Sequence, residues 1–191
     1  MTDSAIPAPA KPDNEIYGIF AGPIDQAAVA RVANGAAVAS SNGVTHCHLA
    51  FQSSGGTVPD GVALYNLLRA FPVPITLYNI GSIASAGVIA YLGAGIRVSS
   101  RLATFMIHRT TSPPQGMTSE RLRATVRSVE IDDARTEEIL RGISLTKENR
   151  DVHQIADLWL SSAEAKEVGL VTEIAEFAPP KGTSLFFLGA A

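Results

Sequence analysis

The stretch of residues 75–92 changes its pattern in the middle, and this change restricts the fold more than any other feature of the chain. Residues 75–78 (ITLY) are mostly apolar or β-branched, which is typical of a buried strand. Residues 86–92 (AGVIAYL) are compatible with a helix, and the glycine-bounded turn GSIASAG at residues 81–87 carries Ser85. A sharp turn from strand to helix exposes such a hydroxyl next to free N–H groups, which favour negative charge.

Strand-like and helix-like segments alternate along the whole chain, which predicts an α/β fold with a mostly parallel sheet. Besides residues 75–78, we expect strands at residues 17–20, 44–51, 96–99 and 104–108. We expect helices at residues 25–40, 61–71 and 118–143, and further helices after Thr146 and after the capping box of Ser161 and Glu164. A length of 191 residues favours one domain, at residues 17–177, between a flexible Pro/Ala-rich tail (1–16) and a C-terminal tail (178–191) whose apolar residues 185–188 would dock on another surface.

The composition excludes several classes of protein. A formal net charge of −3, with no cluster of Lys or Arg, argues against a nucleic-acid partner. Residues 73–95 are the only candidate for a membrane span, but they contain Pro74 and Asn79 and change pattern midway, so we interpret them as a buried strand and helix. Cys47 is the only cysteine, which rules out an intrachain disulfide, and the N-terminus lacks the pattern of a secretory signal. We therefore expect a cytoplasmic protein, and the low fraction of charged residues (17%) favours self-association.

Three residues carry the groups that acyl transfer requires. Ser85 would be the nucleophile, and His108, which ends the strand-like segment TFMIH, would accept its proton. Asp157 precedes the apolar run LWL, which would bury one side of its carboxylate and aim it at the imidazole. The local pattern alone leaves Ser82 as an alternative nucleophile and Asp151 as an alternative acid.

The other histidines have a simpler interpretation. His46 and His48 alternate on one face of a strand and could share a metal ion, but no third ligand is evident, so we interpret them as structural. His153 lies on a polar helix, and we expect it to be exposed to solvent. We expect neither a metal nor an organic cofactor.

Four segments, in this order of the chain, resemble motifs of the Clp protease proteolytic subunit. FQSSGG at residues 51–56 resembles the family's oxyanion turn, with Ser54 where the family usually has proline. GSIASAG resembles the nucleophile segment, MIH at residues 106–108 the histidine strand, and DLWLSSAEA at residues 157–165 the aspartate segment. The resemblance extends over about residues 17–175.

This resemblance implies a Clp protease/crotonase-like fold of repeated β-β-α units, with a protruding handle helix formed by residues 118–143. It implies a serine endopeptidase with the triad Ser85, His108 and Asp157, and an oxyanion hole made by the backbone N–H groups of Gly56 and Ala86. The implied partners are peptide or unfolded-protein substrates, further copies of the chain in a heptameric ring or stacked heptamers, and a Clp-type ATPase unfoldase. The segment before the first strand is shorter than in the family, which weakens the case for the unfoldase.

Three other functions remain open at this point. An enzyme with a Ser–Lys dyad, like the related signal-peptide peptidases, is disfavoured because none of the lysines lies beside the segments that contain Ser85 and His108. A crotonase-like acyl-CoA enzyme would also use two backbone N–H groups, but it would not need Ser85, His108 and Asp157 together. A catalytically silent, structural ring subunit would keep the fold without needing an aligned triad.

Overall fold

The structure is a computed structural model and describes residues 14–112, 116 and 118–188. Its strands form a sheet of eight strands with the order β6-β5-β3-β2-β1-β8, and β4 pairs with β3 and β7. The strands are β1 (Glu15–Ala21), β2 (His46–Ser53), β3 (Ile75–Ala84), β4 (Ile96–Ser99), β5 (Thr104–Ile107), β6 (Leu158–Ser161), β7 (Glu173–Ile174) and β8 (Leu185–Phe187). Every pairing is parallel except that of β5 with β6, so the expected α/β fold with a mostly parallel sheet is confirmed.

Six helices complete the described part of the chain. They are α1 (Gln26–Ser41), α2 (Val58–Arg69), α3 (Ala86–Tyr91), α4 (Ser119–Leu140), α5 (Lys147–Ile155) and α6 (Ser162–Glu167). Polar side chains fix where they begin: Asp25, Thr118 and Thr146 each accept a hydrogen bond from a backbone N–H in the first turn. The capping box of Ser161 and Glu164 is present as expected.

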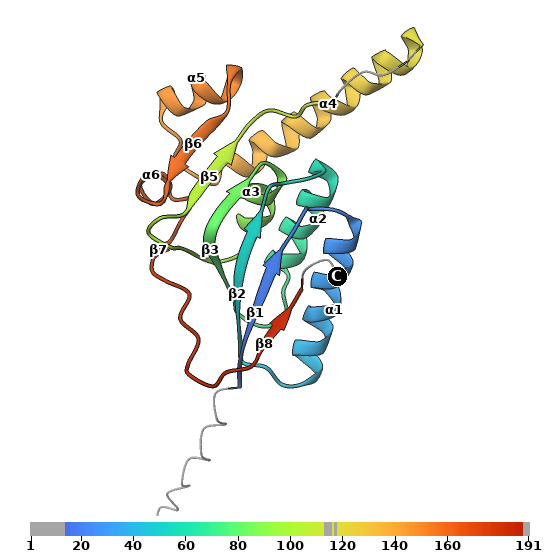
Figure 1. Cartoon of the computed structure of the whole chain (residues 1–191). Helices are drawn as coiled ribbons and strands as arrows, with labels where there is room; N and C mark the ends of the chain where they lie inside the picture. Colours follow the sequence, from blue (N-terminus) through green and yellow to red (C-terminus); the bar gives the residue numbers. More distant parts are fainter. Residues whose placement is uncertain (1–13, 113–115, 117, 189–191) are drawn as a thin grey trace, which may run out of the picture.

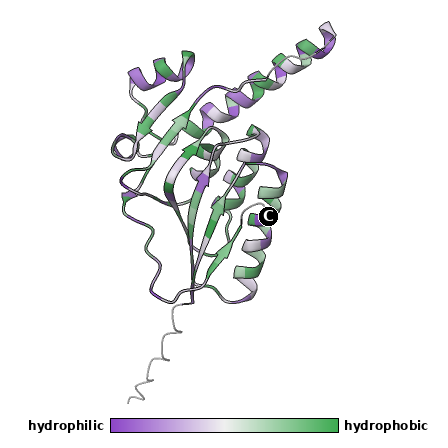
Figure 2. Cartoon of the chain, in the orientation of Figure 1, coloured by the Kyte–Doolittle hydropathy of each residue, from purple (hydrophilic) through white to green (hydrophobic). Residues whose placement is uncertain are grey.

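The hydrophobic core lies between the sheet and the helices α1, α2 and α3. Phe20, Leu49, Leu64 and Leu77 are all fully buried there, with at most 1% of each residue exposed. Figure 2 shows hydrophobic residues concentrated on the strands and on these three helices. This packing fixes the strand ends on which the candidate site is built, because a close-packed interior tolerates little displacement.

Helix α4 extends away from the body of the molecule (Figure 1), as expected for a protruding helix. Only Thr136 and Leu140, near its C-terminal end, are buried. Leu122, Val126 and Ile131 on the projecting part are at least 40% exposed. Among the helices of residues 14–112, 116 and 118–188, none is both long and apolar enough to cross a membrane.

Three features differ from the expectations. Strand β3 continues through residues 79–84, so the glycine-containing segment is part of the strand and the chain turns only at Ser85. Residues 158–161 form strand β6, which pairs antiparallel with β5. The sequence does not predict this strand, because four residues are too few to show a strand pattern. Strand β1 already begins at Glu15, two residues before the expected start of the domain, and the preceding residues 1–13 lie outside the described part.

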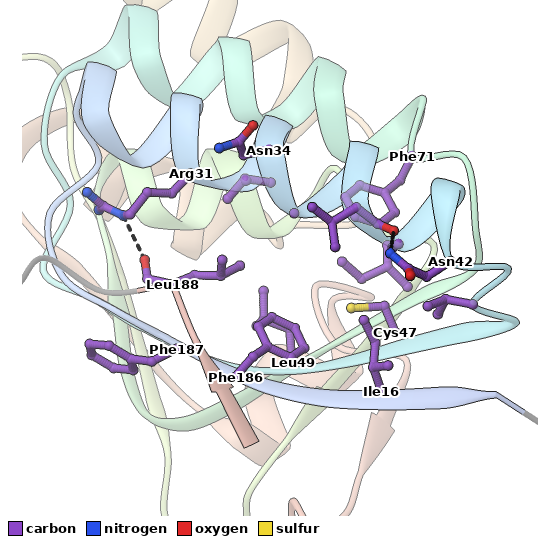
Figure 3. A pocket seen from close by; sticks show the side chains of 16 residues that line it. Ile16, Arg31, Asn34, Asn42, Cys47, Leu49, Phe71, Phe186, Phe187 and Leu188 are labelled. Carbon is purple, nitrogen blue, oxygen red and sulfur yellow. Dashed lines mark hydrogen bonds between the residues drawn. The ribbon is translucent and has the colours of Figure 1, made fainter. Parts of the chain in front are cut away.

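The C-terminal segment also folds onto the sheet. After β7 the chain returns as β8, which is parallel to β1 (Figure 1). The ring of Phe186 packs so closely over Gly18 that a Cβ atom at Gly18 would lie 2.3 Å from the nearest ring carbon. Arg31 Nε donates a hydrogen bond to the Leu188 carbonyl at 2.7 Å (Figure 3). An apolar cavity of about 510 Å³ lies between α1, the sheet and this strand. Residues 185–188 therefore dock within their own chain, as Phe186 and Leu188 pack against the core.

Candidate active site

Ser85 sits at the sharp turn between β3 and α3. Its φ of 55° makes it the one non-glycine residue with positive φ in the described part of the chain. A left-handed backbone costs an ordinary L-residue about 1–2 kcal/mol, and such strain is found most often at functional sites. The turn sets the half-buried Ser85 side chain at the end of a central strand.

His108 is brought to Ser85 by the neighbouring strand. Strands β3 and β5 are parallel, with Ala84 opposite Met106, so the residues that follow them leave the sheet at the same edge. The Ser85 N–H donates to the Met106 carbonyl at 2.8 Å, which ties the turn to β5. Nε2 of His108 lies 2.7 Å from Oγ of Ser85. With Nε2 as acceptor, the hydroxyl donates to the imidazole, which is the geometry that a general base requires.

The glycine-rich turn after β2 packs directly against Ser85. A Cβ atom at Gly55, whose φ is +97°, would lie 2.6 Å from the Ser85 Cβ. Gly56 is bridged to Ile24, because Ile24 N–H donates to the Gly55 carbonyl and Thr57 N–H donates to the Ile24 carbonyl. These two bonds leave the Gly56 N–H on the other side of the chain, and Gly56 lines the same cleft as Ser85 and His108.

Asp157 is close to His108 in register but does not contact it by a hydrogen bond. Ile107 lies opposite Leu158 in the antiparallel ladder, so His108 and Asp157 are the next residues at the same end. Asp157 is exposed, and within the described residues its carboxylate has no hydrogen bond or ion pair. The expected partial burial of Asp157 is therefore wrong: the run LWL turns Leu158 and Leu160 to the core, and the aspartate precedes the buried part.

A different carboxylate fixes the segment that follows His108. Asp133 on α4 accepts hydrogen bonds from the Arg109 side chain (Nε at 3.0 Å) and from the Thr110 N–H (2.9 Å). Partial burial alone would raise the pKa of Asp133, but these hydrogen bonds lower it below its ordinary value. Gln154 on α5 also accepts from Arg109. Arg109 thus joins β5, α4 and α5 beside the candidate base.

Two cavities adjoin the pair of Ser85 and His108. The larger is an open cleft of about 450 Å³ between the glycine-rich turn, the segment after β5 and α4. It is lined by Gly56, Pro59, Thr110 and Asp132 as well as by the pair itself. The smaller, about 20 Å³, lies toward α3 and α4, and Ala86 and Thr136 are among its lining residues. Sequence reasoning missed Thr136, because nothing in a charged helix distinguishes a threonine that will face a cavity.

The remaining histidines lie elsewhere. His46 and His48 stack on one face of the sheet, where Nε2 of His46 lies 2.8 Å from Thr76 Oγ1 and Nδ1 of His48 lies 2.9 Å from the Tyr78 hydroxyl. Burial and the neighbouring His46 lower the pKa of His48. No group of three or more potential metal ligands occurs in the part of the chain that the structure describes.

His153 is buried, with only 3% of it exposed, and its Nε2 lies 3.2 Å from the Glu137 carboxylate. The expectation of an exposed His153 is therefore wrong. The reason is that α5 turns this position of its polar sequence toward the body of the molecule, where α4 supplies the acidic partner.

Comparisons with known proteins point in one direction. A model of the family described as Clp protease matches residues 18–178. The ATP-dependent Clp protease proteolytic subunit 2 of Treponema pallidum (strain Nichols) is 29% identical over 129 residues, which cover 65% of this chain and 63% of that protein. The proteolytic subunit 3 of Rhizobium etli is 26% identical over 158 residues, which cover 80% of both proteins. The match to the Treponema protein thus spans less than two thirds of that relative.

Among solved structures, a ClpP1 point mutant from Listeria monocytogenes superposes with a TM-score of 0.73. It is 22% identical and the match covers 84% of this chain and 91% of the other. At this level of identity the likeness establishes the fold, and the expected Clp protease fold is confirmed.

Proposed function

Because the chain belongs to the Clp protease family, we propose that it is a serine endopeptidase that hydrolyses peptide bonds in peptides or unfolded proteins. The observation that carries the proposal is the 2.7 Å separation of His108 Nε2 and Ser85 Oγ at the strained turn beside a glycine-rich segment. Ser85 and His108 belong to two separate sequence motifs, and both line the same cleft. This arrangement supports the proposal.

In the proposed mechanism, Ser85 Oγ attacks the carbonyl carbon of the scissile bond while His108 Nε2 takes its proton. The oxyanion that forms accepts hydrogen bonds from the N–H groups of Gly56 and Ala86, and losing one such donor typically lowers the rate by about 10²–10³. The protonated His108 then gives its proton to the leaving amine. Water, activated by His108, releases the acyl group from Ser85 in the reverse sequence of bond changes.

Asp157 completes the proposed triad by accepting a hydrogen bond from His108 Nδ1–H and stabilising the imidazolium. Its position in register with His108, one residue beyond the pair of Ile107 and Leu158, supports this role. We also propose that copies of the chain assemble into rings that enclose the cleft. Leu122 and Val126, which are 45% and 52% exposed and lie one turn apart on α4, support an assembled state because adjoining exposed apolar side chains mark interaction surfaces.

A cytoplasmic location and cooperation with a Clp-type ATPase unfoldase also belong to the proposal. The lone, buried thiol of Cys47 is compatible with a reducing compartment. Cell fractionation tests the location. Comparing hydrolysis of a fluorogenic peptide, an unfolded protein and a tagged folded protein, with and without an unfoldase and ATP, tests the partner.

A catalytically silent ring subunit is the second candidate function, and one observation favours it: Asp157 makes no hydrogen bond to His108. Hydrolysis of a fluorogenic peptide by the wild-type chain and by Ser85→Ala, His108→Ala and Asp157→Asn decides between the candidates. The peptidase predicts that the first two variants lose activity and that the third is strongly impaired. Because triad members act as a unit, the double variant of His108 and Asp157 is expected to be little worse than the worse single one. No hydrolysis by an assembled wild-type protein would support the silent subunit.

A further inference from the structure

The small cavity beside Ser85 has dimensions that restrict what it can hold. Its volume of about 20 Å³ exceeds the roughly 10–15 Å³ that one water needs but is far below the several hundred Å³ of a typical ligand pocket. Val58, Ile89 and Leu140 supply apolar walls, and Ser85 and His108 border it directly. Any group that enters this cavity is therefore small and lies next to the atoms of the proposed reaction.

Thr136 supplies the one unpaired hydroxyl group of this cavity. The residue is only 7% exposed, and its Oγ1 has no hydrogen-bond partner. A threonine inside a helix commonly bonds a carbonyl of the preceding turn, and Thr136 does not do so. Buried polar groups in native proteins are nearly always paired with protein or ordered water, so this hydroxyl needs a partner in the cavity. A water supplies it in the free protein, and a small substrate group supplies it on displacing that water.

We propose that this cavity receives the side chain of the substrate residue whose carbonyl carbon Ser85 attacks, and that Thr136 selects a small, hydrogen-bonding side chain there, serine above all. The inference rests on the proposed function and specifies its substrates. The carbonyl carbon must lie at Ser85 Oγ, and the side chain begins two bonds away, beyond the Cα atom. The open cleft and this cavity both border Ser85: the cleft has room for the peptide backbone, and the cavity, which Ser85 and Thr136 share, receives the side chain.

The selectivity follows from size and pairing. A hydroxymethyl group both donates and accepts, so it fits the cavity and pairs with Thr136 Oγ1. A methyl group also fits but leaves that hydroxyl unpaired, which costs binding in the transition state. A leucyl or phenylalanyl side chain exceeds the volume of the cavity and would have to displace α4.

The experiment compares kcat/KM for fluorogenic peptides that differ only in this residue, which is Ser, Ala or Leu. We expect Ser to exceed Ala by about tenfold, and Leu to be the poorest. Thr136→Val keeps the shape but removes the hydroxyl, so the ratio of Ser to Ala should fall to about one. Thr136→Ala enlarges the cavity and should raise cleavage of the Leu peptide. Thr45→Val, at an exposed threonine outside both cavities, is the matched control and should leave the profile unchanged.

Thermal unfolding of each variant shows that it is folded. Labelling of Ser85 by a fluorophosphonate distinguishes a failure of the proposed peptidase activity from a failure of the proposed selectivity. A wild-type protein that is labelled at Ser85 but cleaves Leu and Ser peptides equally well would overturn this inference and leave the proposed function intact. An unchanged ratio of Ser to Ala in Thr136→Val would do the same. Failure of the assembled wild-type protein to be labelled at all would overturn both.

Discussion

Replacing Gly55 by alanine tests whether the glycine-rich turn is fixed in place by its contact with Ser85. A Cβ atom at this position would lie 2.6 Å from Ser85 Cβ and 2.9 Å from the Ala84 carbonyl oxygen, which is closer than such atoms approach in proteins. The φ of +97° adds a backbone penalty of about 1–2 kcal/mol. Relieving the overlap in a packed region adds about 1–3 kcal/mol. The sum, about 2–5 kcal/mol, corresponds to a fall in Tm of roughly 4–20 °C for a chain of this length.

The same substitution should impair the active site more than the fold. The turn must move away from Ser85 to relieve the contact, which also moves the Gly56 N–H, and a misplacement of about 1 Å can cost about 10²-fold in rate. Gly95→Ala is the matched control, because Gly95 is exposed and a Cβ atom there would meet nothing within 4 Å. The measurements are Tm by calorimetry and the rate of fluorophosphonate labelling. An unchanged Tm and labelling rate in Gly55→Ala would refute this description of the turn.

Three further predictions concern the rest of the molecule. Burial raises the pKa of the Cys47 thiol to about 12, so iodoacetamide at pH 8 should modify it only as fast as the protein unfolds, and rapid modification of folded protein would contradict this. The lowered pKa of Asp133 means that its pairing with Arg109 stabilises the fold above about pH 4, and this stabilisation is lost as the pH falls through the lowered pKa. The difference in Tm between wild type and Asp133→Asn should therefore be present at pH 7 and vanish in strong acid. Phe186→Ala should lower the free energy of unfolding by about 1–2 kcal/mol, whereas Phe187→Ala, at a residue that is 61% exposed, should change it by less than about 0.5 kcal/mol; equal effects in urea denaturation would contradict the docking of β8.

Local patterns were sufficient to predict the parts of the fold that depend on neighbouring residues. The segment around Ser85 alternates from strand to turn to helix within a few residues, and the capping box of Ser161 and Glu164 is a contact within one turn. The approach of His108 to Ser85 was also predictable, because residues that follow parallel strands meet at one edge of the sheet.

Long-range pairing was not predictable in the same way. Strands β6 and β8 have four and three residues, too few for a periodic pattern, and they form only because β5 and β1 offer unpaired edges. The exposure of Asp157 follows from where β6 begins. The burial of His153 depends on Glu137, which lies on another helix. For these positions the deciding contacts come from segments that are distant in the sequence.

The most direct test of the central claim is the identification of the residue that a fluorophosphonate modifies. We expect one adduct on the wild-type chain, located by mass spectrometry at Ser85, because that hydroxyl lies 2.7 Å from His108 Nε2 at the strained turn. Ser85→Ala should abolish the adduct while the protein stays folded. Modification of Ser82 instead, or undiminished labelling of Ser85→Ala, would show that Ser85 is not the nucleophile.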